Sequence, residues 1–284
     1  MTLLFVGLAC SDGENGVPED DDPEDPITTT FEHEIHPALS MDCFAGAYYR
    51  KAVTSKDFWL GIGGTVVLPE IVFDEDRKNP KKEKQYLDNP SVYMGGSMGG
   101  QETDIGLTWE VIRDENGEVS QERLAFRPFM RRTAYGNQAS NYSNAPAEAK
   151  YYWYPGDEVS MSVQVVEDGK LKFIVEGEGK RYETNYDCAG YIKGNVGEFK
   201  RVNAIDQVSN EGKPAQATKT KVLNAKWKET YLFREYNGEV VKAPMHYNRF
   251  CDMRCPDAMY FDITTTAAEK AVGAETININ GEGY

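Results

Sequence analysis

Apolar and polar side chains alternate strictly after Glu158, and the chain reverses its direction at Asp168-Gly169. This pattern restricts the possible folds more than any other in the sequence. In VSMSVQV the apolar side chains occupy every second position, and polar side chains stand between them. A strand places successive side chains on opposite faces of a sheet, so this pattern predicts a strand with one buried face. Asp168-Gly169 supplies the tight turn of a two-residue hairpin, and LKFIV follows it. The segment therefore predicts an antiparallel β-hairpin.

Further turn signals and strand-like segments extend this pattern over most of the chain. Asn116-Gly117 and Asn237-Gly238 predict two more hairpins. Six other segments have strand composition: CFAGAYYR, DFWLGIGG, DIGLTWEVI, RLAFRPFMR, EFKRVNAI and WKETYLFRE. No long window has the period of a helix. We expect an all-β jelly roll or two-sheet sandwich over residues 40–265, followed by a last strand or tail at residues 266–284.

The charge is concentrated at the N-terminus. The 284 residues carry a formal net charge of −15, and residues 1–26 contain eight acidic and no basic residues, so the remainder carries −7. An acidic body argues against nucleic acid as a partner, because phosphate binding needs a basic face. The apolar run at residues 3–9 is shorter than the roughly 20 residues of a membrane-spanning helix.

The apolar run ends in small residues before Cys10, and this arrangement resembles the signal of a bacterial lipoprotein. The resemblance implies a signal-peptide remnant at residues 1–9 and a lipid anchor on Cys10 that holds the chain at a membrane. No Lys or Arg precedes the run, so we expect the natural start to lie upstream. The alternative is a buried N-terminal strand with a chance cysteine.

The segment after Cys10 is acidic and nearly free of apolar side chains, so it cannot fold onto a core. We expect residues 10–39 to form an extended tether. An acidic run at this place also resembles the surface-export signal of Bacteroidetes lipoproteins. That resemblance implies an exported protein at the outer membrane and cell surface, and the alternative is a linker that no receptor recognises.

Four further cysteines, Cys43, Cys188, Cys251 and Cys255, permit two disulfides with three possible pairings. Cys251 and Cys255 stand near His246, but a zinc site needs a fourth ligand and usually a closer spacing of the cysteines. The sequence therefore favours disulfides or free thiols, and it predicts no metal and no other cofactor.

Three segments, Asp57–Gly64, Thr103–Val111 and Tyr151–Val163, together resemble the strand order of the glutamic peptidases. The segments are DFWLGIGG, then TDIGLTWEV, then YYWYPGDEVSMSV, and the resemblance spans about residues 57–233. It implies a concanavalin A-like double sheet and, in that family, hydrolysis by a glutamine and a glutamate.

The glutamine position of that family is occupied here by Asp104, and Gln101 lies three residues upstream. Glu198 is the candidate for the glutamate. The resemblance thus implies a hydrolase that uses Asp104 or Gln101 with Glu198. Glycosidases of this shape resemble one another in a Glu-x-Asp-x-x-Glu strand, and no such run is present.

A binding role is the other interpretation. Consecutive aromatic side chains at positions 151–154 alternate between two faces, so Tyr152 or Trp153 is a candidate platform for a sugar ring. Arg127, Arg131 and Arg201 are candidate hydrogen-bond donors to a ligand. Aromatic packing and surface charge explain the same residues without a ligand.

The sequence interpretation that we favour is an exported lipoprotein with one β-sandwich domain that binds carbohydrate or a surface protein without catalysis. A glutamic-peptidase-like hydrolase and a structural surface protein without ligand are the alternatives.

Overall fold

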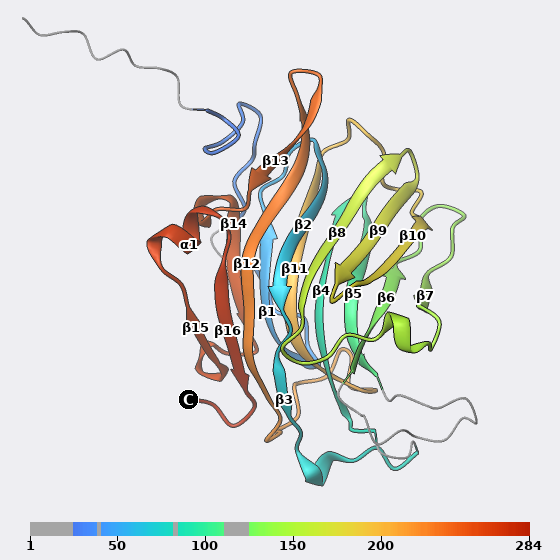
Figure 1. The fold of residues 1–284 in the computed structure, drawn as a ribbon, viewed down its shortest axis with the longest axis vertical. Coiled ribbons are helices and arrows are strands. Elements are labelled where there is room, and N and C mark those ends of the chain that lie inside the picture. Colours follow the sequence, from blue (N-terminus) through green and yellow to red (C-terminus); the bar gives the residue numbers. More distant parts are fainter. Residues whose placement is uncertain (1–24, 39–40, 82–84, 111–124) are drawn as a thin grey trace, which may run out of the picture.

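The computed structural model describes residues 25–38, 41–81, 85–110 and 125–284, and Figure 1 shows two antiparallel β-sheets packed face to face. In these residues the seven-stranded sheet has the order β14 (Phe250–Cys255), β1 (Ala47–Thr54), β11 (Gly197–Gln207), β4 (Asp88–Met98), β5 (Gln101–Glu110), β6 (Ala125–Arg132) and β7 (Asn141–Asn144). The expected two-sheet sandwich is confirmed.

The nine-stranded sheet, within the same described residues, has the order β10 (Lys180–Asp187), β9 (Lys170–Gly177), β8 (Glu158–Glu167), β2 (Trp59–Val67), β12 (Lys221–Tyr236), β16 (Glu275–Asn280) and β15 (Phe261–Thr264). Two short strands, β13 (Glu239–Pro244) and β3 (Glu70–Val72), also pair with β12. The described helical elements are α1 (Ala267–Ala271) and the 3₁₀ turns η1 (Glu75–Arg77), η2 (Ala149–Tyr151), η3 (Tyr247–Arg249) and η4 (Ala258–Tyr260).

The hairpins follow the local turn chemistry. Glu167 pairs with Lys170 around Asp168-Gly169, which joins β8 to β9. Asn237-Gly238 joins β12 to β13, and both of its residues have positive φ, which asparagine and glycine tolerate best. These two predicted hairpins are confirmed. The third, at Asn116-Gly117, lies outside the described residues.

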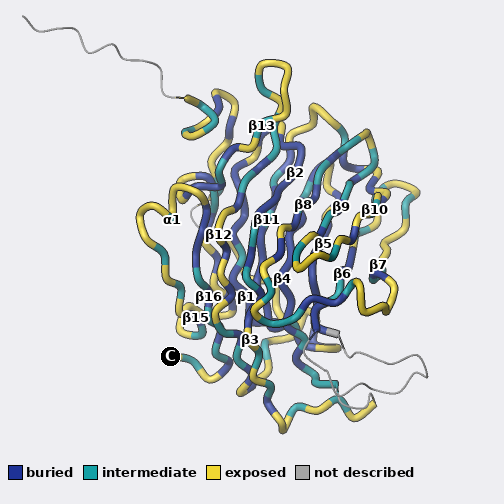
Figure 2. The backbone as a smooth tube through the Cα atoms, viewed as in Figure 1, coloured by how far each residue is buried: buried dark blue, intermediate teal, exposed yellow. Residues whose placement is uncertain are grey.

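The main core lies between the two sheets, where buried positions run along most central strands (Figure 2). Trp59, Trp153 and Trp227 are fully buried there. A second apolar cluster contains only residues of the seven-stranded sheet, among them Tyr49, Tyr93 and Phe129. It lies on the other face of that sheet, which we call the outer face, because strand residues alternate between the two faces.

The described part of the expected tether lies against the sandwich. Phe31 is buried and its ring meets those of Trp59 and Tyr236. Glu34 accepts a hydrogen bond from Nε of Arg249 at 2.9 Å, and neither side chain is exposed. Arg249 also donates to four backbone carbonyl oxygens, three of them at residues 26–29. Residues 25–36 are therefore fastened to the body.

The C-terminal segment forms a strand. A capping box of Thr266 and Glu269 begins the short helix α1, and β16 then pairs with both β12 and β15.

Cys43 and Cys255 form a disulfide, while Cys188 and Cys251 are buried free thiols.

Membrane-spanning helices and metal-binding clusters are both absent from the described residues. No helix there is long and apolar enough to cross a membrane. No three His, Cys, Asp or Glu side chains of that part of the chain are arranged to hold a metal ion.

Candidate functional site

A row of side chains crosses the outer face of the seven-stranded sheet, and we call it the charged row. Its members are neighbours in register from β11 to β7: Lys200, Gly95, Asp104, Arg131 and Tyr142. Because each position lies opposite the next, all of them project on the same face. The row therefore combines two cations, one carboxylate and one phenol along a single line.

Asp104 is the centre of the charged row. Its Oδ1 lies 2.7 Å from Nζ of Lys200, and its Oδ2 lies 2.6 Å from Nη1 of Arg131. Gly95 stands between Lys200 and Asp104 without a side chain, so the lysine reaches across β4. Burial by itself would raise the pKa of Asp104, but the two cations lower it below its usual value. The carboxylate therefore stays ionised and holds no proton to donate.

The row ends in an aromatic group at the edge of the sheet. Tyr142 is 54% exposed, and its ring stacks at 5.9 Å on that of Phe129. Phe129 in turn meets Tyr93 edge to face at 5.7 Å. An exposed ring with buried rings beneath it is a rigid, flat, apolar surface beside the charged groups.

The two partners considered for Asp104 lie elsewhere. Glu198 shares the outer face, but it stands opposite Ser97, two residues beyond Gly95 along β4. Strand spacings put its Cα about 12 Å from that of Asp104. Its carboxylate lies 3.6 Å from Nζ of Lys56. The described geometry thus brings Asp104 to Lys200 and Arg131, not to Glu198.

Gln101 projects on the opposite face and is fully buried. Its amide donates to the carbonyl oxygen of Thr133 and to the side chain of Gln138, and its oxygen accepts from the backbone N–H of Gly190. These contacts fasten two loops to the start of β5. Gln101 and Asp104 therefore lie on opposite faces of β5 and do not meet.

The structure divides the predicted ligand-binding residues between surface and interior. Arg131 belongs to the charged row, and Arg127, two residues earlier on β6, projects on the same outer face. Tyr152 and Trp153 are 2% and 0% exposed, and the indole of Trp153 donates to the carbonyl oxygen of Gly177. In this fold both rings pack in the interior and offer no surface to a sugar.

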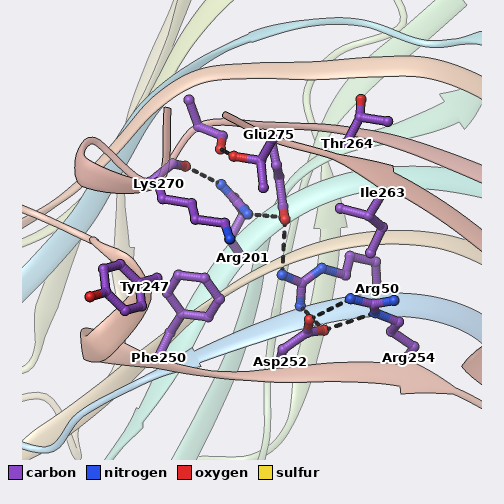
Figure 3. A pocket seen from close by; sticks show the side chains of 13 residues that line it. Arg50, Arg201, Tyr247, Phe250, Asp252, Arg254, Ile263, Thr264, Lys270 and Glu275 are labelled. Atoms are coloured by element: carbon purple, nitrogen blue, oxygen red, sulfur yellow. Dashed lines mark hydrogen bonds and ion pairs between the residues drawn. The ribbon is translucent and has the colours of Figure 1, made fainter. Parts of the chain in front are cut away.

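Arg201 lies between the two sheets, in a pocket at the edge formed by β14, β1, β16 and the β15–α1 connection (Figure 3). We call it the edge pocket. Its Nη2 pairs with Glu275, and its Nη1 donates to Thr230 Oγ1 at 2.8 Å and to the carbonyl oxygen of Gly273 at 2.6 Å. Burial lowers the pKa of Arg201 to about 10, against the opposing effect of Glu275.

Arg50 is one of the edge-pocket residues that the sequence interpretation missed. It lies on β1, pairs with Glu275 at 3.0 Å and with Asp252 at 2.8 Å, and is 2% exposed. A signal was present in AYYRKAVT, where alternation puts this arginine on the same face as Tyr48 and Ala52. A charged residue on the inward face of an apolar strand marks a buried polar site.

No family model matches the chain, and no curated protein matches its sequence. Among solved structures, a scytalido-glutamic peptidase with a transition-state analogue inhibitor has 11% identity and a TM-score of 0.44, with 81% of this chain and 97% of that chain covered. A member of the Eqolisin family of peptidases in complex with a tripeptide has 12% identity, a TM-score of 0.38, and 82% and 98% coverage.

A carbohydrate-binding module, the CBM2 module of an evolved Dit protein of the Lactobacillus casei phage J-1, is a third match. It has 9% identity and a TM-score of 0.31, and the match covers 58% of this chain and 57% of that one. At these identities and TM-scores the matches give this chain no activity and no residue role.

Proposed function

We propose that the protein is a non-catalytic binding module for carbohydrate, with the charged row of the outer face as its binding surface. The observation that carries the proposal is the state of Asp104, a carboxylate held by two cations beside an exposed aromatic ring. An ionised carboxylate accepts hydrogen bonds from sugar hydroxyls, and the guanidinium of Arg131 donates to them. Tyr142 offers a flat surface for the apolar face of a sugar ring.

The same arrangement opposes the hydrolase alternative. A general acid must carry a proton, and a general base must have a pKa near the working pH. Lys200 and Arg131 lower the pKa of Asp104 instead, and the amide of Gln101 lies on the other face of the sheet. We therefore expect no hydrolysis of a denatured protein near neutral pH, where the lowered pKa makes Asp104 a weak base. Activity that disappears in folded Asp104→Ala and Glu198→Ala variants would support the hydrolase and refute the binding module.

A glycan array on the purified 284-residue chain tests the binding module. We expect a subset of glycans to bind, and Tyr142→Ala and Arg131→Gln each to weaken that binding by about tenfold, the order expected from losing one ring contact or one charged hydrogen bond. Tyr284→Ala removes an equally exposed tyrosine, 62% against 54%, and serves as the control. Binding to none of the glycans, or equal binding by the Tyr142→Ala variant, would refute the proposal.

The proposed location is the outer membrane at the cell surface, through a lipid on Cys10. It is supported by the apolar run that ends at this cysteine and by the acidic segment that follows it. Cys10 lies outside the described residues. In cells that express the gene with its natural start, a labelled fatty acid is expected on the wild type and not on Cys10→Ala, and the variant should leave the membrane fraction. Equal labelling of both proteins would exclude the anchor.

A further inference from the structure

The edge pocket carries more positive than negative charge, although the whole chain is acidic. Four cationic side chains line it, those of Arg50, Arg201, Arg254 and Lys270, against two carboxylates, those of Asp252 and Glu275. The pocket thus has a formal charge of +2, while the chain has −15. A concentration of positive charge in an acidic protein attracts anions to that place.

Part of this charge has no counterpart within the described residues. The Nε–H of Arg50 is buried and donates no hydrogen bond there, although the residue is 2% exposed. Lys270 is exposed at the mouth, forms no ion pair with that part of the chain, and extends toward Arg201 in Figure 3. A buried donor without an acceptor costs free energy, which an acceptor brought by a ligand would recover.

The size and the walls of the pocket indicate the kind of ligand. Its volume of about 590 Å³ lies within the range of small-molecule sites. Tyr247, which is 59% exposed, and Phe250 form an aromatic wall, and Ile263 and Thr264 line the β15 side. Cations at the base and at the mouth, with aromatic rings along one wall, match a ligand with an anionic group attached to a ring.

We propose that the edge pocket binds a small carboxylated sugar of hexuronate size, with its carboxylate toward Arg50, Arg254 and Lys270 and its ring toward Tyr247. Arg201 and Glu275 hold the base of the pocket by joining β11 of one sheet to β16 of the other. This site lies between the sheets, so it does not depend on ligand binding at the charged row.

Calorimetric titration of the 284-residue chain tests the site with three probes: glucuronate, glucose as its uncharged match, and inorganic sulfate as a free anion. We expect glucuronate to bind at least tenfold more tightly than glucose and sulfate, and its affinity to fall with added salt. Equal binding of glucose would refute an anion site. Sulfate as tight as glucuronate would refute the assignment to an acidic sugar.

Variants at the mouth assign the binding to this pocket. Lys270→Gln and Arg254→Gln are each expected to weaken the binding of glucuronate by about fivefold. The effect is modest because both side chains are partly exposed to water. Tyr247→Ala should weaken the binding of glucuronate and leave the binding of acetate unchanged, because acetate has no ring. Lys193→Gln removes an exposed lysine that does not line the pocket and is the control.

A thermal shift on the same proteins guards against a folding defect. Each variant should keep the melting temperature of the unliganded wild type, because the changed side chains lie at the surface. Glucuronate should raise the melting temperature of the wild type more than that of Lys270→Gln or Arg254→Gln. Glucuronate affinity that is unchanged in both of these variants would place the binding elsewhere and overturn the proposal.

Discussion

Two carboxyl groups on the outer face show how burial and neighbouring side chains together set the pKa of a single residue. Asp104 is paired with two cations, and its pKa is lowered. Asp206 accepts a hydrogen bond from Ser91 at 2.6 Å, and burial, with Asp104 and Glu211 nearby, raises its pKa to about 6. The hydrogen bond from Ser91 and the charge of Arg131 offset only part of that rise. The face thus holds one carboxylate that remains charged and one carboxyl group that titrates near neutral pH.

Replacing Asp206 with asparagine should change how stability depends on pH. The folded pKa of about 6 exceeds the unfolded value of 3.8, so the folded state binds more protons between these pH values. The contribution of Asp206 is therefore complete below pH 4 and is lost as the pH rises through 6. Relative to wild type, the free energy of unfolding of Asp206→Asn should therefore be higher at pH 8 than at pH 4, by at most about 3 kcal/mol. Each unit of pKa shift is worth 1.36 kcal/mol.

Urea unfolding from pH 4 to pH 8 measures this difference, with Asp42→Asn, an exposed aspartate, as the control. A difference between wild type and Asp206→Asn that is the same at both ends of the range would contradict the raised pKa.

Asp104→Asn should lose about 2 kcal/mol of unfolding free energy, because Lys200 and Arg131 would keep their charges without the carboxylate between them. Asp76→Asn breaks a pair of similar length, 2.7 Å to Lys219, whose two side chains are largely exposed. It should cost less than about 1 kcal/mol. Chemical denaturation at pH 7 compares the two, and equal losses would show that the outer-face pair is fully screened by water.

At the scale of the elements, Gly95 of β4 combines a structural and a functional role. A Cβ at this position would lie 2.0 Å from the carbonyl oxygen of Thr103 on β5, so the strands leave no room for one. The same gap lets Lys200 reach Asp104. Gly95→Ala is expected to cost about 2 to 4 kcal/mol, as backbone must move to admit the methyl group.

Gly100, in the turn between β4 and β5, has open space around it, and Gly100→Ala should cost about 1 kcal/mol through its positive φ alone. Thermal unfolding of the two variants checks the order. A Gly95→Ala protein as stable as Gly100→Ala would mean that β4 and β5 separate without cost.

The sequence predicted those elements that depend on local rules. The β8–β9 and β12–β13 hairpins follow from alternation and from Asp-Gly and Asn-Gly turns. β4 was not predicted, because Pro90 and two adjacent glycines interrupt its pattern, and only its pairing with β11 and β5 makes it a strand. The order of strands in the sheets likewise depends on contacts between distant segments, which no local pattern contains.

The candidate sites were predicted less completely, for the same physical reason. Alternation places Asp104 and Arg131 each on one face of its own strand, but only the register brings the two together. Trp153 illustrates the opposite difficulty. An aromatic residue next to a strand suits a sugar-binding platform or a core position equally well, and this one is buried in the core between the sheets. Arg50 and Glu275 lie 225 residues apart in the chain.

For the whole molecule, the disulfide between Cys43 and Cys255 closes a loop with a sequence separation of 212. Such a long loop restricts the unfolded chain strongly, so Cys43→Ser combined with Cys255→Ser should cost about 3 to 5 kcal/mol. Reduction of the wild type should lower its stability to that of the double variant and leave the variant unchanged. Calorimetry with and without reductant measures both, and an unchanged wild type would mean that the bond contributes nothing.

The same covalent link determines how the protein would respond to a pulling force on its two ends. Tension on the C-terminal side first meets β15 and β16, which pair with each other and, through β16, with β12. Once these strands have separated, the tension crosses the single bond between Cys43 and Cys255. About 700 Å of contour length stays inside the closed loop, since its sequence separation of 212 would span roughly 3.4 Å for each residue when extended. A pull can therefore extend the residues inside the loop only after the disulfide has been reduced.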